Sequence, residues 1–340
     1  MERILYSFPE GYAVSEDGRL VEYLDLKDES QSGDIILAKV DRMMPGMECA
    51  FVDIGRKKNG FLPMKENSKS FTDGPLRSGE WSAVQIRREE NGDKGAYLSR
   101  DLTIPGNTVI LMPKNRYIGV SNRIQDEMTR NRLRETGKSI AGNRYGLVMR
   151  AAAEKAREEE IREETAELIS QWELVQEKLG NAKKPGEILF AQDPAAQMIR
   201  DYAAAESDVI RMTEIPADLK RQLAASKERM VRLPHGGNIV IDRCEAMTVI
   251  DVNSASVSYP VDKEALVTAA NLEACAEAAV QVRLRDIAGI ILIDFIDMEK
   301  ETDRSLVEEK LKEVLSSDRR KTVVHGWTKL GIMEMTRKRV

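Results

Sequence analysis

Two apolar runs that each stop at a carboxylate constrain the fold of this chain most. Residues 247–250 lead into Asp251, and residues 290–293 lead into Asp294. Both runs are typical of buried strands, and an alanine-rich helical stretch over 262–284 separates them. Strands joined through a helix are typical of an α/β sheet, so we expect both carboxylates at one edge. A carboxylate there costs desolvation energy unless positive charge meets it, which indicates a divalent cation.

A third polar residue accompanies this acidic pair. Asn253 lies two positions after Asp251 and therefore shares its side of an extended strand. Oxygen ligands on rigid strand ends suit Mg²⁺, which takes one or two carboxylates together with phosphate oxygens. The alternative is that Asp251 and Asp294 merely end their strands in turns, but both interrupt otherwise apolar runs. We therefore predict Asp251, Asn253 and Asp294 as catalytic residues, with the two aspartates as the metal ligands.

Composition excludes several classes of protein. The chain has 340 residues, 42% hydrophobic and 32% charged, as expected for a soluble globular protein of two or three domains. It contains no run near the roughly 18 apolar residues of a membrane helix, and its start lacks the apolar core of a secretory signal. Three widely spaced cysteines argue against a disulfide framework and a CxxC zinc site. We expect a cytoplasmic protein without a membrane partner.

Short strands separated by turn residues predict a small closed β-barrel over residues 34–104. Phe51 and Phe61 lie on neighbouring strands of it, and Arg88 and Lys94 lie on a later hairpin. Aromatic rings among basic groups on such a barrel suit single-stranded nucleic acid, because bases stack and phosphates pair. A phenylalanine on a strand is more often part of a core, so both interpretations stay open from the residues alone.

The first thirty residues predict a short β-meander, and residues 107–113 and 117–121 predict two further strands. The chain is mainly helical from about residue 125 to 229 and alternates strand and helix from residue 236. A strand over 142–150 interrupts the first helical stretch, and a helix is expected over 331–339. A net charge of −5 conceals a basic C-terminal segment. This segment is either a solvated surface or a site that binds phosphates. Its expected RNA contacts include Arg337 and Lys338.

Several motifs occur in an order that resembles the bacterial ribonuclease E/G family. They are residues 33–40, 50–55, 250–254, 293–298 and 330–339. The resemblance covers most of the chain and implies a multidomain α/β and β architecture. It places an S1-type OB barrel at 34–104, inserted in a reduced RNase H-like portion at 1–33 and 181–230. A region similar to a 5′-phosphate sensor would occupy 105–180, and a DNase I-like α/β catalytic domain 231–340.

The resemblance implies a Mg²⁺-dependent endoribonuclease in RNA processing or decay. It would cut single-stranded, A/U-rich RNA by attack of an activated water, leaving 5′-phosphate and 3′-hydroxyl ends. Asp251 and Asp294 match the family's metal ligands, and Asn253 matches an asparagine that orders the site. The residues that match RNA-binding positions are Phe51, Phe61, Arg88, Lys94, Lys321 and Lys329.

Three departures from the family pattern qualify this expectation. Arg150 matches the arginine of the 5′-phosphate sensor, but Ala151 replaces the threonine that follows it, so we expect little 5′-end sensing. The segment between the helix at 216–229 and the turn at 234–237 is shortened. A zinc-binding CxxC motif is missing, so we expect at most a homodimer rather than the family's tetramer.

Two other functions compete with this one. The first is a non-cleaving S1-type RNA-binding protein with a vestigial nuclease domain. The second is a phosphatase or DNA nuclease built on a similar metal-binding sheet, which the barrel disfavours.

Overall fold

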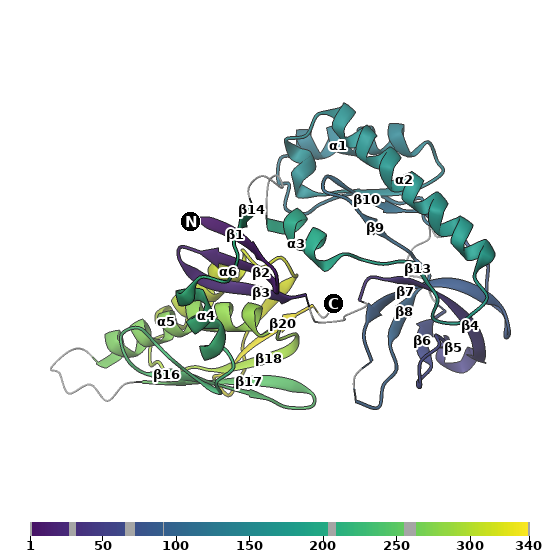
Figure 1. The fold of residues 1–340 in the computed structure, drawn as a ribbon. Coiled ribbons are helices and arrows are strands. Elements are labelled where there is room, and N and C mark those ends of the chain that lie inside the picture. The colour runs from purple at the N-terminus through teal and green to yellow at the C-terminus, as the bar shows by residue number, and fades with distance from the viewer. Residues whose placement is uncertain are drawn as a thin grey trace. The chain divides into compact units, whose positions relative to one another are not determined.

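The computed structural model describes residues 2–26, 32–64, 72–90, 92–202, 209–254 and 263–338 (Figure 1). The chain divides into two compact units. The central unit comprises the described part of residues 29–204, and the terminal unit combines the described parts of 1–28 and 205–339. The terminal unit is therefore built from segments at both ends of the sequence.

A closed five-stranded barrel forms the first part of the central unit, as the sequence predicts. Its strands are β4 (Ile35–Met44), β5 (Cys49–Asp53), β6 (Gly60–Pro63), β7 (Trp81–Arg88) and β8 (Tyr97–Ser99). β4 pairs with both β5 and β7, which closes the barrel. Alternate residues fill the interior, among them Ile36, Val52 and Leu62. A 3₁₀ turn (Pro45–Met47) joins β4 to β5, and β13 (Ile188–Phe190) pairs with the first residues of β4.

The second part of the central unit is a four-stranded sheet with helices. Its strands are β9 (Ile104–Pro105), β10 (Val109–Met112), β11 (Ile118–Val120) and β12 (Gly146–Met149), in the order β11-β12-β10-β9. The helices are α1 (Glu127–Ala141), α2 (Glu158–Asn181) and α3 (Pro194–Tyr202), with a 3₁₀ turn at Ala151–Glu154. Asp126 caps α1 at its start, and Gly142, at a φ of 54°, ends it. β12 confirms the strand predicted over 142–150.

A six-stranded sheet dominates the terminal unit (Figure 1). Its order is β15-β16-β17-β18-β20-β19. The strands are β15 (Met230–Arg232), β16 (Asn238–Arg243), β17 (Met247–Asn253), β18 (Gly289–Asp294), β19 (Thr322–Trp327) and β20 (Met333–Arg337). β17 and β18 are parallel because α5 (Lys263–Leu284) connects them, and α6 (Glu301–Leu315) packs beside α5. One sheet face thereby forms a core with both helices, which leaves the other face of β17 and β18 exposed.

A smaller N-terminal sheet covers α5 from a second side. It contains β1 (Arg3–Phe8), β2 (Gly11–Glu16), β3 (Arg19–Asp25) and β14 (Val209–Arg211), in the order β14-β1-β2-β3. β3 contacts both α5 and α4 (Ala217–Ala225). α5 therefore lies between two sheets, and its buried Ala274, Ala278 and Ala279 keep it thin enough to do so.

The helix expected over 331–339 is wrong, because residues 333–337 form strand β20 instead. Met333 and Met335 are buried while Glu334 between them is exposed, which is the two-residue period of a strand. β20 pairs with both β18 and β19, so tertiary contacts decide its conformation. Arg339, which was included in the expected helix, lies outside the described residues.

Candidate active site

The two predicted metal ligands are direct neighbours in the sheet. Asp251 on β17 is the registered partner of Asp294 on β18, and neighbouring strands lie about 4.8 Å apart. Ile250 and Ile293, one residue earlier on each strand, point into the core with the helices. The two aspartates consequently occupy the opposite, exposed face. This places two carboxylates side by side, as the sequence predicts, while their catalytic role stays a prediction.

Asn253 holds one of these carboxylates. Its side-chain amide donates a hydrogen bond to Asp251 Oδ2 at 2.9 Å and reaches Asn238 Oδ1 on β16 at 3.4 Å. The bond to Asp251 connects residues two positions apart on the same face of β17, which is the geometry expected from the sequence. It orients the carboxylate and leaves its second oxygen available to a cation.

A buried asparagine fixes the chain immediately after Asp294. Asn271, fully buried on α5, donates to the carbonyl of Ile296 at 2.9 Å and accepts from its backbone N–H at 3.0 Å. Glu264 at the start of α5 accepts from the backbone N–H groups of Glu299 and Lys300. Asn271 was not predicted as a site residue, although an amide within an alanine-rich helix is an available signal.

A histidine lies at the same end of the sheet. Asn238 is the partner of Asn253, so the turn that precedes β16 lies beside the carboxylates' end of β17. In that turn, the Nδ1 atom of His235 contacts the Glu273 carboxylate of α5, and its side chain is otherwise 85% exposed. Sequence reasoning treated this segment only as a turn.

The donor set fits a hard divalent cation with an open coordination sphere. Two carboxylates are the protein ligands that Mg²⁺ commonly takes, with water and phosphate oxygens completing its shell. In the part of the chain that the structure describes, no group of three or more His, Cys, Asp or Glu residues could hold a metal ion. A closed, four-ligand structural zinc site is therefore not found among those residues.

The basic residues expected to contact RNA separate into two groups. Lys329 is exposed in the turn between β19 and β20, at the end of the sheet where Asp294 lies. Lys321 and Lys338 are also exposed but flank the opposite end of the same strands. They lie roughly 15 Å along the strand direction from the carboxylates, at about 3.3 Å per residue.

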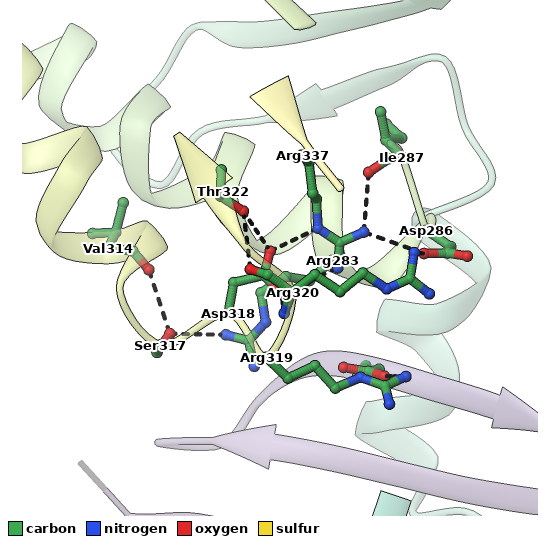
Figure 2. A network of polar contacts seen from close by, with 11 residues as sticks. Arg283, Asp286, Ile287, Val314, Ser317, Asp318, Arg319, Arg320, Thr322 and Arg337 are labelled. Atoms are coloured by element: carbon green, nitrogen blue, oxygen red, sulfur yellow. Dashed lines mark hydrogen bonds and ion pairs between the residues drawn. The ribbon is translucent and has the colours of Figure 1, made fainter. Parts of the chain in front are cut away.

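Arg337 is not a surface residue, and its predicted contact with RNA is wrong. Its guanidinium is buried and donates to Asp318 Oδ2 at 2.6 Å, to Asp286 Oδ1 at 3.2 Å and to the Ile287 carbonyl at 3.0 Å. Figure 2 shows that this network also contains Arg320, which pairs with Asp286. Arg337 points inward because it alternates with Glu334 and Thr336 on β20, where odd-numbered positions face the core.

The barrel carries the predicted aromatic pair on its outer surface. Phe51 and Phe61 are registered partners on β5 and β6, with ring centroids 6.1 Å apart and planes at 75°. Arg88 and Lys94 are exposed, and their contact with RNA stays a prediction. Arg88 lies over the ring of Tyr97, 4.3 Å from its centroid. Tyr97 was not predicted, because only the closed barrel brings β8 next to β6 and β7.

Arg150, the expected 5′-phosphate residue, is engaged within the protein. Its Nη1 donates to the Gly106 carbonyl at 2.6 Å, and its Nη2 pairs with Asp201 Oδ1 at 2.5 Å. Its side chain is 22% exposed. A carboxylate already neutralises the guanidinium, which adds to the expectation from Ala151 that 5′-end sensing is weak.

The sequence is similar to a known family and to several known proteins. The model of the Ribonuclease E/G family matches residues 103–215 and 215–340. Ribonuclease G of Escherichia coli (strain K12) is 33% identical over 380 aligned positions, covering 95% of this chain and 76% of that protein. Ribonuclease G of Haemophilus influenzae is 33% identical over 357 positions, covering 90% and 72%. Ribonuclease E of Nostoc sp. is 33% identical over 377 positions, covering 96% and 54%.

The fold and the paired carboxylates define a multidomain α/β protein with a closed five-stranded β-barrel. Similarity over nearly its whole length shows more: the chain belongs to the Ribonuclease E/G family. Within the described residues, every helix falls short of the length and apolar character that a membrane crossing requires.

Proposed function

We propose that this chain cleaves single-stranded RNA with a Mg²⁺ ion held by Asp251 and Asp294. Membership of the Ribonuclease E/G family makes it an endoribonuclease. We add three proposals to this family assignment: the metal, the preference for single-stranded A/U-rich RNA, and the 5′-phosphate and 3′-hydroxyl products. The observation that carries them is the registered, exposed pair of carboxylates on parallel strands β17 and β18.

Each residue of the site has a distinct task in this proposal. When bound, Mg²⁺ supplies polarisation of the scissile phosphate and activation of the attacking water. Asp251 and Asp294 provide its two protein oxygens, and Asn253 keeps the Asp251 carboxylate in place through its hydrogen bond of 2.9 Å. Asn271 holds the segment that follows Asp294. Lys329, at the same sheet end, offers a positive charge to the RNA backbone.

The barrel supplies the preference for single strands. Phe51 and Phe61 present partly exposed rings on which unpaired bases can stack, and Arg88 and Lys94 meet phosphates. A duplex keeps its bases stacked on one another, so these rings favour unpaired RNA. We also propose the family's domain division, with an S1-type barrel, a sensor-like region, a reduced RNase H-like portion and a DNase I-like catalytic domain.

A metal-dependent cleavage assay tests the proposal. A fluorescent A/U-rich oligonucleotide is incubated with the wild type, Asp251→Asn, Asp294→Asn and the control Asp218→Asn, an exposed carboxylate on α4. We expect Mg²⁺-dependent cleavage that EDTA stops. Each active-site variant should lose at least about 100-fold in rate, because metal catalysis contributes several kcal/mol. Asp218→Asn should cleave normally, and RNA binding measured by anisotropy should persist in all variants.

The same assay distinguishes the competing function. A non-cleaving RNA-binding protein would bind the oligonucleotide and leave it intact with or without Mg²⁺. Equal cleavage by wild type and both active-site variants would contradict the assigned metal ligands. Comparing RNA with DNA of the same sequence tests the nucleic acid preferred.

A further inference from the structure

A continuous row of side chains crosses the outside of the barrel. Successive registered partners are Arg42 on β4, Phe51 on β5, Phe61 on β6, Tyr97 on β8 and Arg88 on β7. Registered partners lie on the same face of a sheet. All five are exposed or partly exposed, and both sequence neighbours of each aromatic residue are buried. The row therefore presents three aromatic rings with an arginine at each end.

Tyr97 is joined to this row by contacts on two sides. Its ring centroid lies 5.7 Å from that of Phe61, with planes at 27°, and Arg88 Cζ lies 4.3 Å from the Tyr97 centroid. An arginine over a ring is held by the negative charge of the ring face. The guanidinium itself is planar and can stack against a nucleobase while meeting a phosphate. Tyr97 and Arg88 thus continue the surface that begins with Phe51 and Phe61.

We propose that Tyr97 and the Arg88 guanidinium over it form a third base-stacking position, which lengthens the RNA site of the barrel by one nucleotide. This rests on the proposed function, because single-stranded RNA is its ligand. The arginines at both ends of the row favour RNA over a protein partner, since their charge complements phosphates on either side of three stacked bases. The acidic neighbour Glu89 is paired with Arg56 at 2.8 Å, which offsets its repulsion of the RNA backbone.

The test measures how affinity depends on RNA length. Fluorescein-labelled A/U oligonucleotides of increasing length are titrated into the full chain carrying Asp294→Asn, and binding is followed by anisotropy. Adding Tyr97→Ala should weaken binding by about 5- to 100-fold, the range expected for one stacked base, and shorten by one nucleotide the length at which affinity stops rising. Tyr97→Phe keeps the ring and should preserve both. Tyr117→Ala, an exposed ring outside the barrel, is the matched control.

Two further variants distinguish loss of the third stacking position from an effect on folding and from an effect of charge alone. Arg88→Lys retains the charge of an exposed residue but loses the planar group, so weaker binding than the parent supports stacking. Phe61→Ala reports on the barrel as a whole. If Phe61→Ala weakens binding while Tyr97→Ala and Arg88→Lys bind every length like the parent, the third position is overturned and the proposed function stands. Absence of any RNA binding by the parent overturns both.

Discussion

The two hydrogen bonds of Asn271 connect a buried helix position to the backbone after Asp294. Asn271→Ala removes both partners of Ile296 and leaves its N–H and carbonyl without them. We expect unfolding free energy to fall by about 1–3 kcal/mol, the usual cost of unsatisfied buried groups. Cleavage should fall further than the unfolded fraction explains, because the segment beside a metal ligand is released. Urea unfolding and single-turnover cleavage of the same sample measure the two effects, and equal losses would contradict a positioning role.

The cysteines differ in reactivity because they differ in burial. Cys244 is exposed, whereas Cys49 and Cys275 are buried, and burial raises the pKa of the Cys275 thiol to about 12. A thiol reacts as the thiolate, so both the burial of Cys275 and its raised pKa protect it from thiol reagents. We expect Ellman's reagent at pH 8 to label one thiol of the native protein quickly and three after denaturation. Cys244→Ser should abolish the fast phase, and a fast phase that persisted would place another thiol at the surface.

Arg150 leads to a prediction about RNA ends. Because Asp201 pairs with its guanidinium and Ala151 lacks a hydroxyl, a 5′-phosphate gains little there. We expect 5′-monophosphorylated RNA to be cut less than tenfold faster than the same RNA with a 5′-hydroxyl, which corresponds to less than about 1.4 kcal/mol. Competition between the two labelled substrates in one reaction measures the ratio directly. A larger advantage would show that Arg150 leaves Asp201 to bind phosphate.

Residues whose neighbours are close in sequence were the ones that could be predicted. The period of two along β17 places Asn253 beside Asp251, and an apolar run ending at Asp294 indicates its strand end. Asn271 and Tyr97 could not be assigned in this way. Their partners are 25 or more residues away or on strands that meet only in the closed barrel.

At the scale of single elements, β20 is anchored by its last residue. Burial raises the pKa of Asp318, but hydrogen bonds and charge from Arg337, with the Arg320 N–H and Thr322, outweigh it and hold the pKa below its ordinary value of 3.8. The ionised carboxylate therefore stabilises the fold above that pH, and this stabilisation is lost as pH falls through and below it.

Asp318→Asn should accordingly destabilise the protein in a pH-dependent way. The variant removes the carboxylate 2.6 Å from the buried Arg337 and leaves it the more exposed Asp286 at 3.2 Å, so we expect a cost of up to about 3–5 kcal/mol near pH 7. The difference from the wild type should shrink below about pH 3.8, where Asp318 of the unfolded wild type becomes protonated, and it should vanish once the native carboxylate is protonated at still lower pH. Urea unfolding curves at pH 7 and pH 3 test this. A difference that is the same at both values would contradict the assigned charge pairing.

The same strand shows why local sequence can mislead. Methionine, glutamate, arginine and lysine over 331–339 all favour helix in isolation. Pairing with β18 on one side and β19 on the other imposes a strand instead. In α5, by contrast, the helical pattern is strong enough to be recognised, but only the structure explains its alanines, which lie between two sheets.

At the scale of the molecule, the barrel was predictable and the long-range partners of the N-terminal sheet were not. The barrel is made by strands that follow one another within residues 35–99. The N-terminal sheet instead depends on residues far along the chain: Glu16 pairs with Arg283 at 2.9 Å across 267 positions, and Glu22 pairs with Arg319. No local sequence pattern predicts such partners.

This split origin of the terminal unit sets an order for synthesis on the ribosome. The first strands emerge early, yet their partners on α5 and after α6 are translated more than 250 residues later. The central unit is continuous in sequence and can fold while translation proceeds, as domains generally do. Until α5 and the residues after α6 have emerged, β1–β3 remain without these partners, and apolar residues such as Leu20 stay uncovered. Nascent chains are therefore most exposed to chaperones and proteases at β1–β3, and the carboxylate pair forms only after α5 and β18 have emerged.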